Sequence, residues 1–190
     1  FTKKEVLNKT TDLSDCEYIF STWYMPNFTE EEIHVLFPSL KCVFYAAGTV
    51  KYFAEPLLRS GIRVFSAAKA NGIPVAEYTA AQIILAGKGY YQAQRAYRWP
   101  ILHRGFNRSR GYAERKYGNY GAKIGIIGCG AIGSKVVELL KPYHLDVYVY
   151  DPYLSEERAN DLGVKGVDME ELFSLCDVVS NHLPDIPETK

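Results

Sequence analysis

Three glycines spaced as Gly-x-Gly-x-x-Gly, with an acid that follows them, are the residues of this sequence best suited to chemistry. Gly128, Gly130 and Gly133 come directly after an apolar run, and Asp151 ends a second one. The N–H groups at the start of a helix that follows such a turn bind phosphates, because they lie at the positive end of the helix dipole. The pattern predicts a strand, a glycine turn, a helix and a second strand that bind a dinucleotide.

Each of these residues has a separate role in the predicted site. Gly128 permits a tight turn, Gly130 lets the backbone approach a pyrophosphate, and Gly133 lets the helix pack closely on the strand. Asp151 stands 18 residues after Gly133, close to the spacing of an acid that accepts hydrogen bonds from the adenosine ribose hydroxyls. A carboxylate there repels a 2′-phosphate, so we expect NAD rather than NADP as the cofactor.

The alternative reading is an ordinary structural turn, because three glycines in a loop also occur without a ligand. The apolar run at 124–127 suits a buried parallel strand, and Val136, Val137, Leu139 and Leu140 form one face of a helix. This context favours the cofactor site over the structural turn.

The elements that would position this site alternate between strand and helix patterns. Before the motif, the predicted elements are strands at 18–21, 42–46 and 63–66 and a helix at 30–37. Thr29 and Glu32 fit a capping box at the start of that helix. This stretch forms an α/β unit separate from the one around the glycine motif.

Other elements connect and extend the second unit. A long helix is predicted from 75 to 98, and 99–121 is predicted as a hinge or crossover. After Asp151, the pattern predicts helices at 155–162 and 169–175 and a strand at 177–181. These are successive steps of a doubly wound parallel sheet, so the predicted fold class is α/β.

Composition excludes several other classes of function. The 22 Lys and Arg residues balance the 22 Asp and Glu residues, so the net charge favours neither nucleic acid nor an acidic membrane surface. The one basic stretch is interpreted as a solvated loop rather than an RNA site; it contains Arg104, Arg108, Arg110, Arg115 and Lys116.

Cysteine and histidine spacing predicts neither disulfides nor a metal site. The four cysteines stand far apart, as free and mostly buried thiols of a reducing compartment would, and the four histidines have no ligand spacing. The first residues carry no apolar signal segment, and no run approaches the roughly 18 apolar residues of a membrane span. We expect a cytoplasmic protein.

The sequence resembles the D-isomer-specific 2-hydroxyacid dehydrogenase family over nearly its whole length. Four blocks occur in the family's order: Ala46–Thr49, similar to its glycine-rich substrate loop; 70–79, similar to the start of its interdomain helix; the glycine motif with Asp151-Pro152; and 176–184, ending in Pro187-Glu-Thr189. The resemblance implies a flavodoxin-like substrate domain into which a Rossmann NAD-binding domain is inserted. In this chain they correspond to residues 1–98 and 99–190, the second domain being incomplete.

The resemblance also implies site residues. Main-chain amides at Ala47 and Gly48 would hold the substrate carboxylate, which suits small residues that expose N–H groups. The implied cofactor-binding residues are Gly128, Gly130, Ala131, Ile132, Gly133, Asp151, His182, Leu183, Pro184 and Thr189. Val50 and Lys51 stand where the family commonly has Asp-Asn, so the substrate class does not carry over.

No catalytic residue is assigned to the chain. The family's Arg, acid and His follow the His-Leu-Pro block, and this sequence stops at Lys190, so we expect an inactive fragment. Arg104 is interpreted as a loop arginine and His182 as a cofactor-side residue. The implied reaction of the parent protein is NAD-dependent interconversion of a 2-oxo acid and a D-2-hydroxy acid, with a His moving the proton.

Two other functions stay open at this point. One is a non-catalytic NAD-sensing protein of the corepressor kind on the same fold. The other is a Rossmann enzyme of another class. A homodimer is expected, and Tyr90, Tyr91, Tyr97 and Trp99 would either form its contact or pack against the hinge loop.

Overall fold

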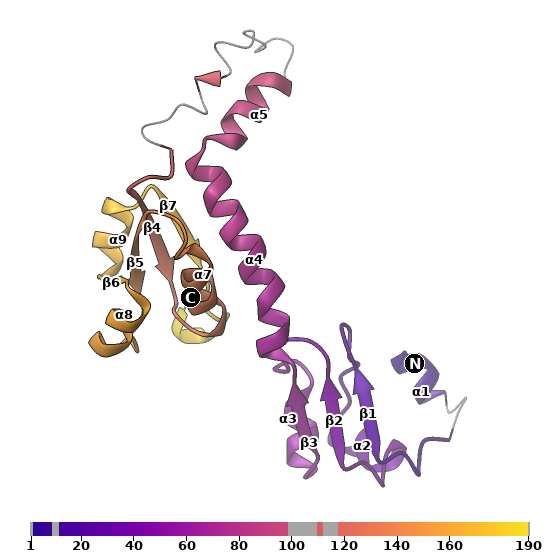
Figure 1. The fold of residues 1–190 in the computed structure, drawn as a ribbon. Coiled ribbons are helices and arrows are strands. Elements are labelled where there is room, and N and C mark those ends of the chain that lie inside the picture. Colours follow the sequence, from indigo (N-terminus) through magenta and orange to yellow (C-terminus); the bar gives the residue numbers. More distant parts are fainter. Residues whose placement is uncertain (1, 9–11, 99–109, 112–117, 190) are drawn as a thin grey trace. The chain divides into compact units, whose positions relative to one another are not determined.

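A computed structural model describes residues 2–8, 12–98, 110–111 and 118–189. The chain divides into two compact units, residues 1–72 and 73–190 (Figure 1). Contacts divide it after residue 72 rather than after residue 98, because Ala76, Ala80 and Ile83 pack into the core of the second unit. Each unit contains its own parallel sheet, which confirms the α/β class.

The first unit is built from strands joined by helices. Its elements are α1 (Lys3–Leu7), β1 (Tyr18–Ser21), α2 (Glu30–Leu36), β2 (Cys42–Tyr45), α3 (Ala54–Arg59) and β3 (Arg63–Ser66). The strands pair in the order β1-β2-β3. Two right-handed crossovers in the same direction put α2 and α3 on the same face of the sheet. The core forms there, around Ile33, Val43 and Leu57.

The predicted capping box sets the start of α2. Glu32 donates its N–H to Thr29 Oγ1 (3.1 Å), and Thr29 donates its N–H to Glu32 Oε2 (2.9 Å). Both bonds satisfy groups that a helix end would otherwise leave unpaired. The cap directs the next turn so that Ile33 is buried against the sheet.

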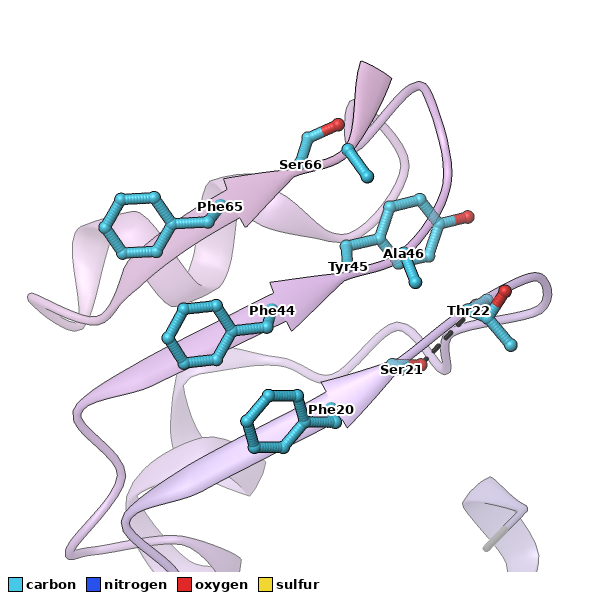
Figure 2. A pocket seen from close by; sticks show the side chains of 9 residues that line it. Phe20, Ser21, Thr22, Phe44, Tyr45, Ala46, Phe65 and Ser66 are labelled. Atoms are coloured by element: carbon cyan, nitrogen blue, oxygen red, sulfur yellow. Dashed lines mark hydrogen bonds between the residues drawn. The ribbon is translucent and has the colours of Figure 1, made fainter. Parts of the chain in front are cut away.

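The other face of this sheet carries a row of aromatic rings. Phe20, Phe44 and Phe65 occupy the same register on β1, β2 and β3. Their rings stack with centroid separations of 4.9 and 5.5 Å, side by side on the open face (Figure 2). All three side chains are exposed. This phenylalanine row has no helix packed on it among the described residues.

The second unit is a doubly wound sheet. The sheet and its flanking helices consist of β4 (Ala122–Ile127), α7 (Ala131–Leu140), β5 (Leu145–Tyr150), α8 (Glu156–Leu162), β6 (Lys165–Gly166), α9 (Met169–Leu175), β7 (Val178–Asn181) and the 3₁₀ turn η1 (Pro187–Thr189). The strand order is β6-β5-β4-β7. Successive strands are therefore added on one side of β4 and then, with β7, on its other side. As a result, α7 and α9 lie on opposite sides of the sheet (Figure 1). Ligands of such sheets bind at the carboxyl ends of the strands at this reversal.

The single long helix predicted from 75 to 98 is wrong in two respects. The structure has α4 (Ala68–Gly87), which begins before Pro74, and α5 (Tyr90–Arg98). Gly89 separates the two helices with φ +69°, a conformation that only glycine adopts at little cost. The hinge predicted at 99–121 lies largely outside the described residues.

Candidate functional site

The predicted site residues of the second unit meet at the carboxyl edge of its sheet. Gly128 donates its N–H to Tyr150 O (2.8 Å), beyond the end of β4. On the other side, His182 donates its N–H to Ile127 O (2.7 Å). Parallel pairing thus brings the glycine turn, the end of β5 and the segment after β7 together, although they are far apart in sequence.

The three glycines occupy three different environments. Gly128 has φ +85°, and a Cβ there would lie 3.1 Å from the carbonyl carbon of His182. A Cβ on Gly133 would lie 2.0 Å from Gly128 O, so α7 can approach the turn only with glycine at this position. A Cβ on Gly130 would have no heavy atom within 4 Å, so the space beside this residue is open.

The start of helix α7 presents main-chain N–H groups beside the glycine turn. Gly130 is the N-cap and makes no side-chain hydrogen bond to the helix. The described residues offer no partner to the N–H groups of Ala131, Ile132 and Gly133, whereas Ser134 donates its N–H to Gly130 O (3.0 Å). These N–H groups and the helix dipole form a site for an anion.

The carboxylate of Asp151 faces the glycine turn. Asp151 Oδ2 accepts a hydrogen bond from the N–H of Cys129 (2.6 Å), and Oδ1 accepts one from the N–H of Tyr153 (2.8 Å). Each oxygen of a carboxylate can accept a second bond. The acid therefore fixes the turn and keeps acceptor capacity for ribose hydroxyls.

Cys129, between the first two glycines, is a buried thiol. Burial raises the pKa of the Cys129 thiol, and the positive charge of Arg158 opposes this shift. Sequence reasoning singled out neither Arg158 nor the N–H of Cys129. The one available signal was the position of Arg158, seven residues after Asp151 in the helix that follows β5.

The segment after β7 lies against the turn and is held by local hydrogen bonds. Leu183 Cδ2 would be 3.2 Å from a Cβ on Gly128, and the His182 ring nitrogen Nε2 is 3.0 Å from Ser180 Oγ. Burial lowers the pKa of the His182 imidazole, because it disfavours the charged ring. Thr189 donates its hydroxyl to Pro184 O (2.5 Å), which closes the segment on itself.

The predicted substrate loop lies in the first unit, after β2. Ala47 is fully buried, and the Ser66 hydroxyl lies 3.0 Å from Ala47 O and 2.5 Å from Gly48 O. Within the described part of the chain, the N–H groups of Ala47 and Gly48 have no hydrogen-bond partner. A Cβ on Gly48 would lie 3.2 Å from Asn71 Nδ2, so this position is tight. Ser66 was not predicted as part of the loop.

The remaining predictions concern surface features. Tyr90, Tyr91 and Tyr97 are exposed on α5, and the dimer contact assigned to them stays a prediction. Trp99 and the basic stretch, apart from Arg110, lie outside the described residues. All four cysteines are free, as predicted; two are buried and two half-buried.

The described ranges contain neither a metal-binding cluster nor a membrane-spanning helix. No cluster of three or more His, Cys, Asp or Glu side chains there is placed to hold a metal ion. No helix in the same ranges combines the length and apolar character needed to cross a membrane.

Comparison with known proteins places this chain in a family. The D-3-phosphoglycerate dehydrogenase of Bacillus subtilis is 30% identical over 190 residues, which are 98% of this chain and 35% of the relative. The D-lactate dehydrogenase of Escherichia coli is 26% identical, with a TM-score of 0.65 over 98% of this chain and 56% of that one. An NAD complex of the NAD-dependent formate dehydrogenase of Staphylococcus aureus is 26% identical, with a TM-score of 0.68 over 97% of this chain and 53% of that one.

This chain spans about a third of the length of the Bacillus subtilis enzyme and about half of each of the two solved structures. Residues 83–190, more than half of the chain, match the NAD binding domain of the D-isomer specific 2-hydroxyacid dehydrogenases. With the glycine turn and Asp151 at the carboxyl edge of a doubly wound sheet, the chain belongs to the D-isomer specific 2-hydroxyacid dehydrogenase family.

Proposed function

We propose that this protein is an NAD-dependent oxidoreductase that interconverts a 2-oxo acid and a D-2-hydroxy acid, and that its second unit binds NAD. The observation that carries the proposal is the arrangement at the end of β4. The Asp151 carboxylate lies 2.6 Å from the N–H of Cys129, next to a helix start that presents unpaired N–H groups. The acid lies where it could bind the adenosine ribose, and the helix start lies where it could bind the pyrophosphate.

The residues present fit this cofactor. The pyrophosphate would accept hydrogen bonds from the N–H groups of Ala131 and Ile132, and the open space at Gly130 admits it. The ribose hydroxyls would donate to Asp151, and the segment His182–Pro184 would line the other side of the turn. When bound, NAD supplies hydride transfer, and the protein supplies binding and orientation.

The first unit would hold the substrate. A 2-oxo acid carries a carboxylate, and the unpaired N–H groups of Ala47 and Gly48 are suited to bind one. The Ser66 hydroxyl can donate its one proton to Gly48 O (2.5 Å), which orders the amides of this loop before a ligand arrives. We assign binding of the cofactor and of the substrate carboxylate to the described residues of the two units.

Calorimetric titration of the 190-residue chain with NADH tests the cofactor proposal. Circular dichroism first establishes that each protein is folded. We expect Gly130→Val to lose NADH binding, because its side chain would fill the space that the pyrophosphate needs. The matched control is Gly166→Val in β6, where a Cβ also has no neighbour within 4 Å, and its binding should equal that of the unaltered chain. Normal binding by folded Gly130→Val would overturn the proposed site.

A further inference from the structure

The residues that follow the predicted substrate loop differ in charge from the family pattern. Val50 and Lys51 stand where the family commonly has Asp-Asn. The Val50 side chain packs against the core of the first unit, and its carbonyl oxygen accepts the N–H groups of Phe53 (3.1 Å) and Ala54 (3.0 Å). Val50 therefore serves the fold, whereas the Lys51 side chain is exposed. With an acid lost and a base gained, the charge next to this loop is more positive than in the family pattern.

A second lysine follows the neighbouring strand. Strands β2 and β3 are adjacent and parallel, so their carboxyl ends lie at the same edge of the sheet. At this edge, the Ser66 hydroxyl donates to Gly48 O (2.5 Å), and a Cβ on Gly48 would lie 3.2 Å from Asn71 Nδ2. Lys69 stands between Ser66 and Asn71, in the first turn of α4, and is exposed. The segment that contains Lys69 is thus in contact with the predicted substrate loop.

The position of Lys69 is unfavourable for the helix that contains it. The start of a helix is the positive end of its dipole, so a base in the first turn is repelled there. The first turn of α4 contains no acid that would offset this repulsion. Residues that oppose the stability of their own element are typical of functional positions. The charge of Lys69 is therefore better explained by a ligand than by the fold.

The connections at the carboxyl edge of the first sheet contain no Asp or Glu, and their charged residues are the two lysines. These connections are residues 22–28, 46–53 and 66–72. The next acid along the chain, Glu55, makes an ion pair with Arg59. The N–H groups of Ala47 and Gly48, which have no partner in the described part of the chain, suit one carboxylate. An edge with two bases and no acid favours a ligand with a further negative charge.

We propose that the substrate of this site carries a second anionic group, a phosphate or a second carboxylate, which Lys51 and Lys69 attract while the amides of Ala47 and Gly48 bind the first carboxylate. The inference rests on the proposed function and names the substrate class of that same site. Two ammonium groups attract a ligand of two or more charges more strongly than a monoanion, because the Coulomb energy is proportional to the ligand charge. Salt weakens the attraction, since both side chains are exposed.

The experiment is a nuclear magnetic resonance titration of the folded chain, in which the N–H signals of Ala47 and Gly48 report binding. The probes are D-lactate with one carboxylate, D-malate with two, and D-3-phosphoglycerate with a carboxylate and a phosphate. The ionic strength is fixed at about 0.1 M, where charges more than about 10 Å apart are largely screened. We expect D-malate or D-3-phosphoglycerate to bind at least roughly fivefold more tightly than D-lactate. The tighter of the two identifies the second group as a carboxylate or a phosphate.

Variants of the two lysines test their role. Lys51→Asn, Lys69→Gln and the double variant remove positive charge at exposed positions, and circular dichroism establishes that each is folded. Each single variant should bind the tighter probe roughly threefold to tenfold more weakly and change D-lactate affinity by less than about twofold. The matched control is Arg63→Gln, which removes an exposed positive charge at the amino end of β3 and should change neither affinity. Lys51→Gln replaces Lys51→Asn if the latter does not fold.

The outcomes separate this inference from the function on which it rests. If D-lactate binds as tightly as both other probes, the inference is overturned and the carboxylate site stands. Unchanged selectivity in the folded double variant would overturn the role of the lysines, and equal losses in Arg63→Gln would show only a general effect of net charge. If no probe shifts the Ala47 and Gly48 signals of the folded, unaltered chain, the substrate site of the proposed function fails, and this inference fails with it.

Discussion

The N–H of Cys129 donates a 2.6 Å hydrogen bond to Asp151 Oδ2, so the acid that follows β5 holds the glycine turn that follows β4. The bond joins residues 22 positions apart in sequence. A carboxylate that accepts a main-chain N–H makes a stronger bond than a neutral acceptor does. Asp151 therefore contributes to the stability of the turn as well as to the proposed ribose contact.

We predict that Asp151→Ala lowers the free energy of unfolding by about 1–3 kcal/mol, because two main-chain N–H groups lose a charged acceptor. Urea denaturation followed by circular dichroism measures this difference. Asp146→Ala, within β5, is the matched control, since Asp146 is exposed and its ion pair with Lys165 is as long as 4.0 Å. Equal stability losses in the two variants would contradict the structural role of Asp151.

Gly133→Ala should destabilise the chain by about 1–3 kcal/mol, because its Cβ would lie 2.0 Å from the main-chain oxygen of Gly128. This clash exceeds the gain of roughly 1 kcal/mol that alanine brings to a helix. Gly130→Ala, where the Cβ has open space, should cost less than about 1 kcal/mol. Thermal unfolding of the two variants compares them, and the reverse order of stability would refute the packing described at Gly133.

The neutral state of His182 should make stability depend on pH. Burial lowers its pKa in the folded chain, whereas the unfolded chain takes up the proton near the ordinary value of about 6.5. As pH falls below that value, the unfolded state binds more protons than the folded state, so stability present at neutral pH is lost. His182→Gln should lose less stability between about pH 7.5 and about pH 5.5 than the unaltered chain does. Carboxylates shared by both proteins cancel in this comparison; identical pH dependences would contradict the burial assigned to the ring.

The phenylalanine row should contribute little to stability in this chain. Phe20 is 79% exposed and its ring stacks on Phe44, so Phe20→Ser should change the free energy of unfolding by less than about 1 kcal/mol. The variant should bind less of a dye that recognises apolar surface. Val43→Ala, on the buried face of the neighbouring strand, should cost about 1–3 kcal/mol. A larger loss for Phe20→Ser than for Val43→Ala would show that the row is covered.

Local sequence determined most of the elements and their order. The capping box at Thr29 predicted the start of α2, and the strands 18–21 and 63–66 were predicted with the bounds that the structure has. These signals act between residues close in sequence, such as a side chain and the N–H three positions away, and they need no tertiary contact. Helix α3 was not predicted.

Tertiary structure decided what the local pattern left open. The helix predicted to begin at residue 75 begins at Ala68 in the structure. Helix α4 continues through Pro74, because burial of Ala76, Ala80 and Ile83 outweighs one lost hydrogen bond. The break at Gly89 depends on a backbone conformation that glycine permits and does not require.

The sequence by itself determined that a glycine turn and an acid belong to one site, because their spacing is that of a strand, a helix and a second strand. It did not determine the partners of Asp151. The parallel register of β4 and β5, with Ile127 opposite Tyr150, brings the acid to the N–H of Cys129. Such contacts depend on the pairing of strands and the packing of helices, which are set by the whole core and not by neighbouring residues.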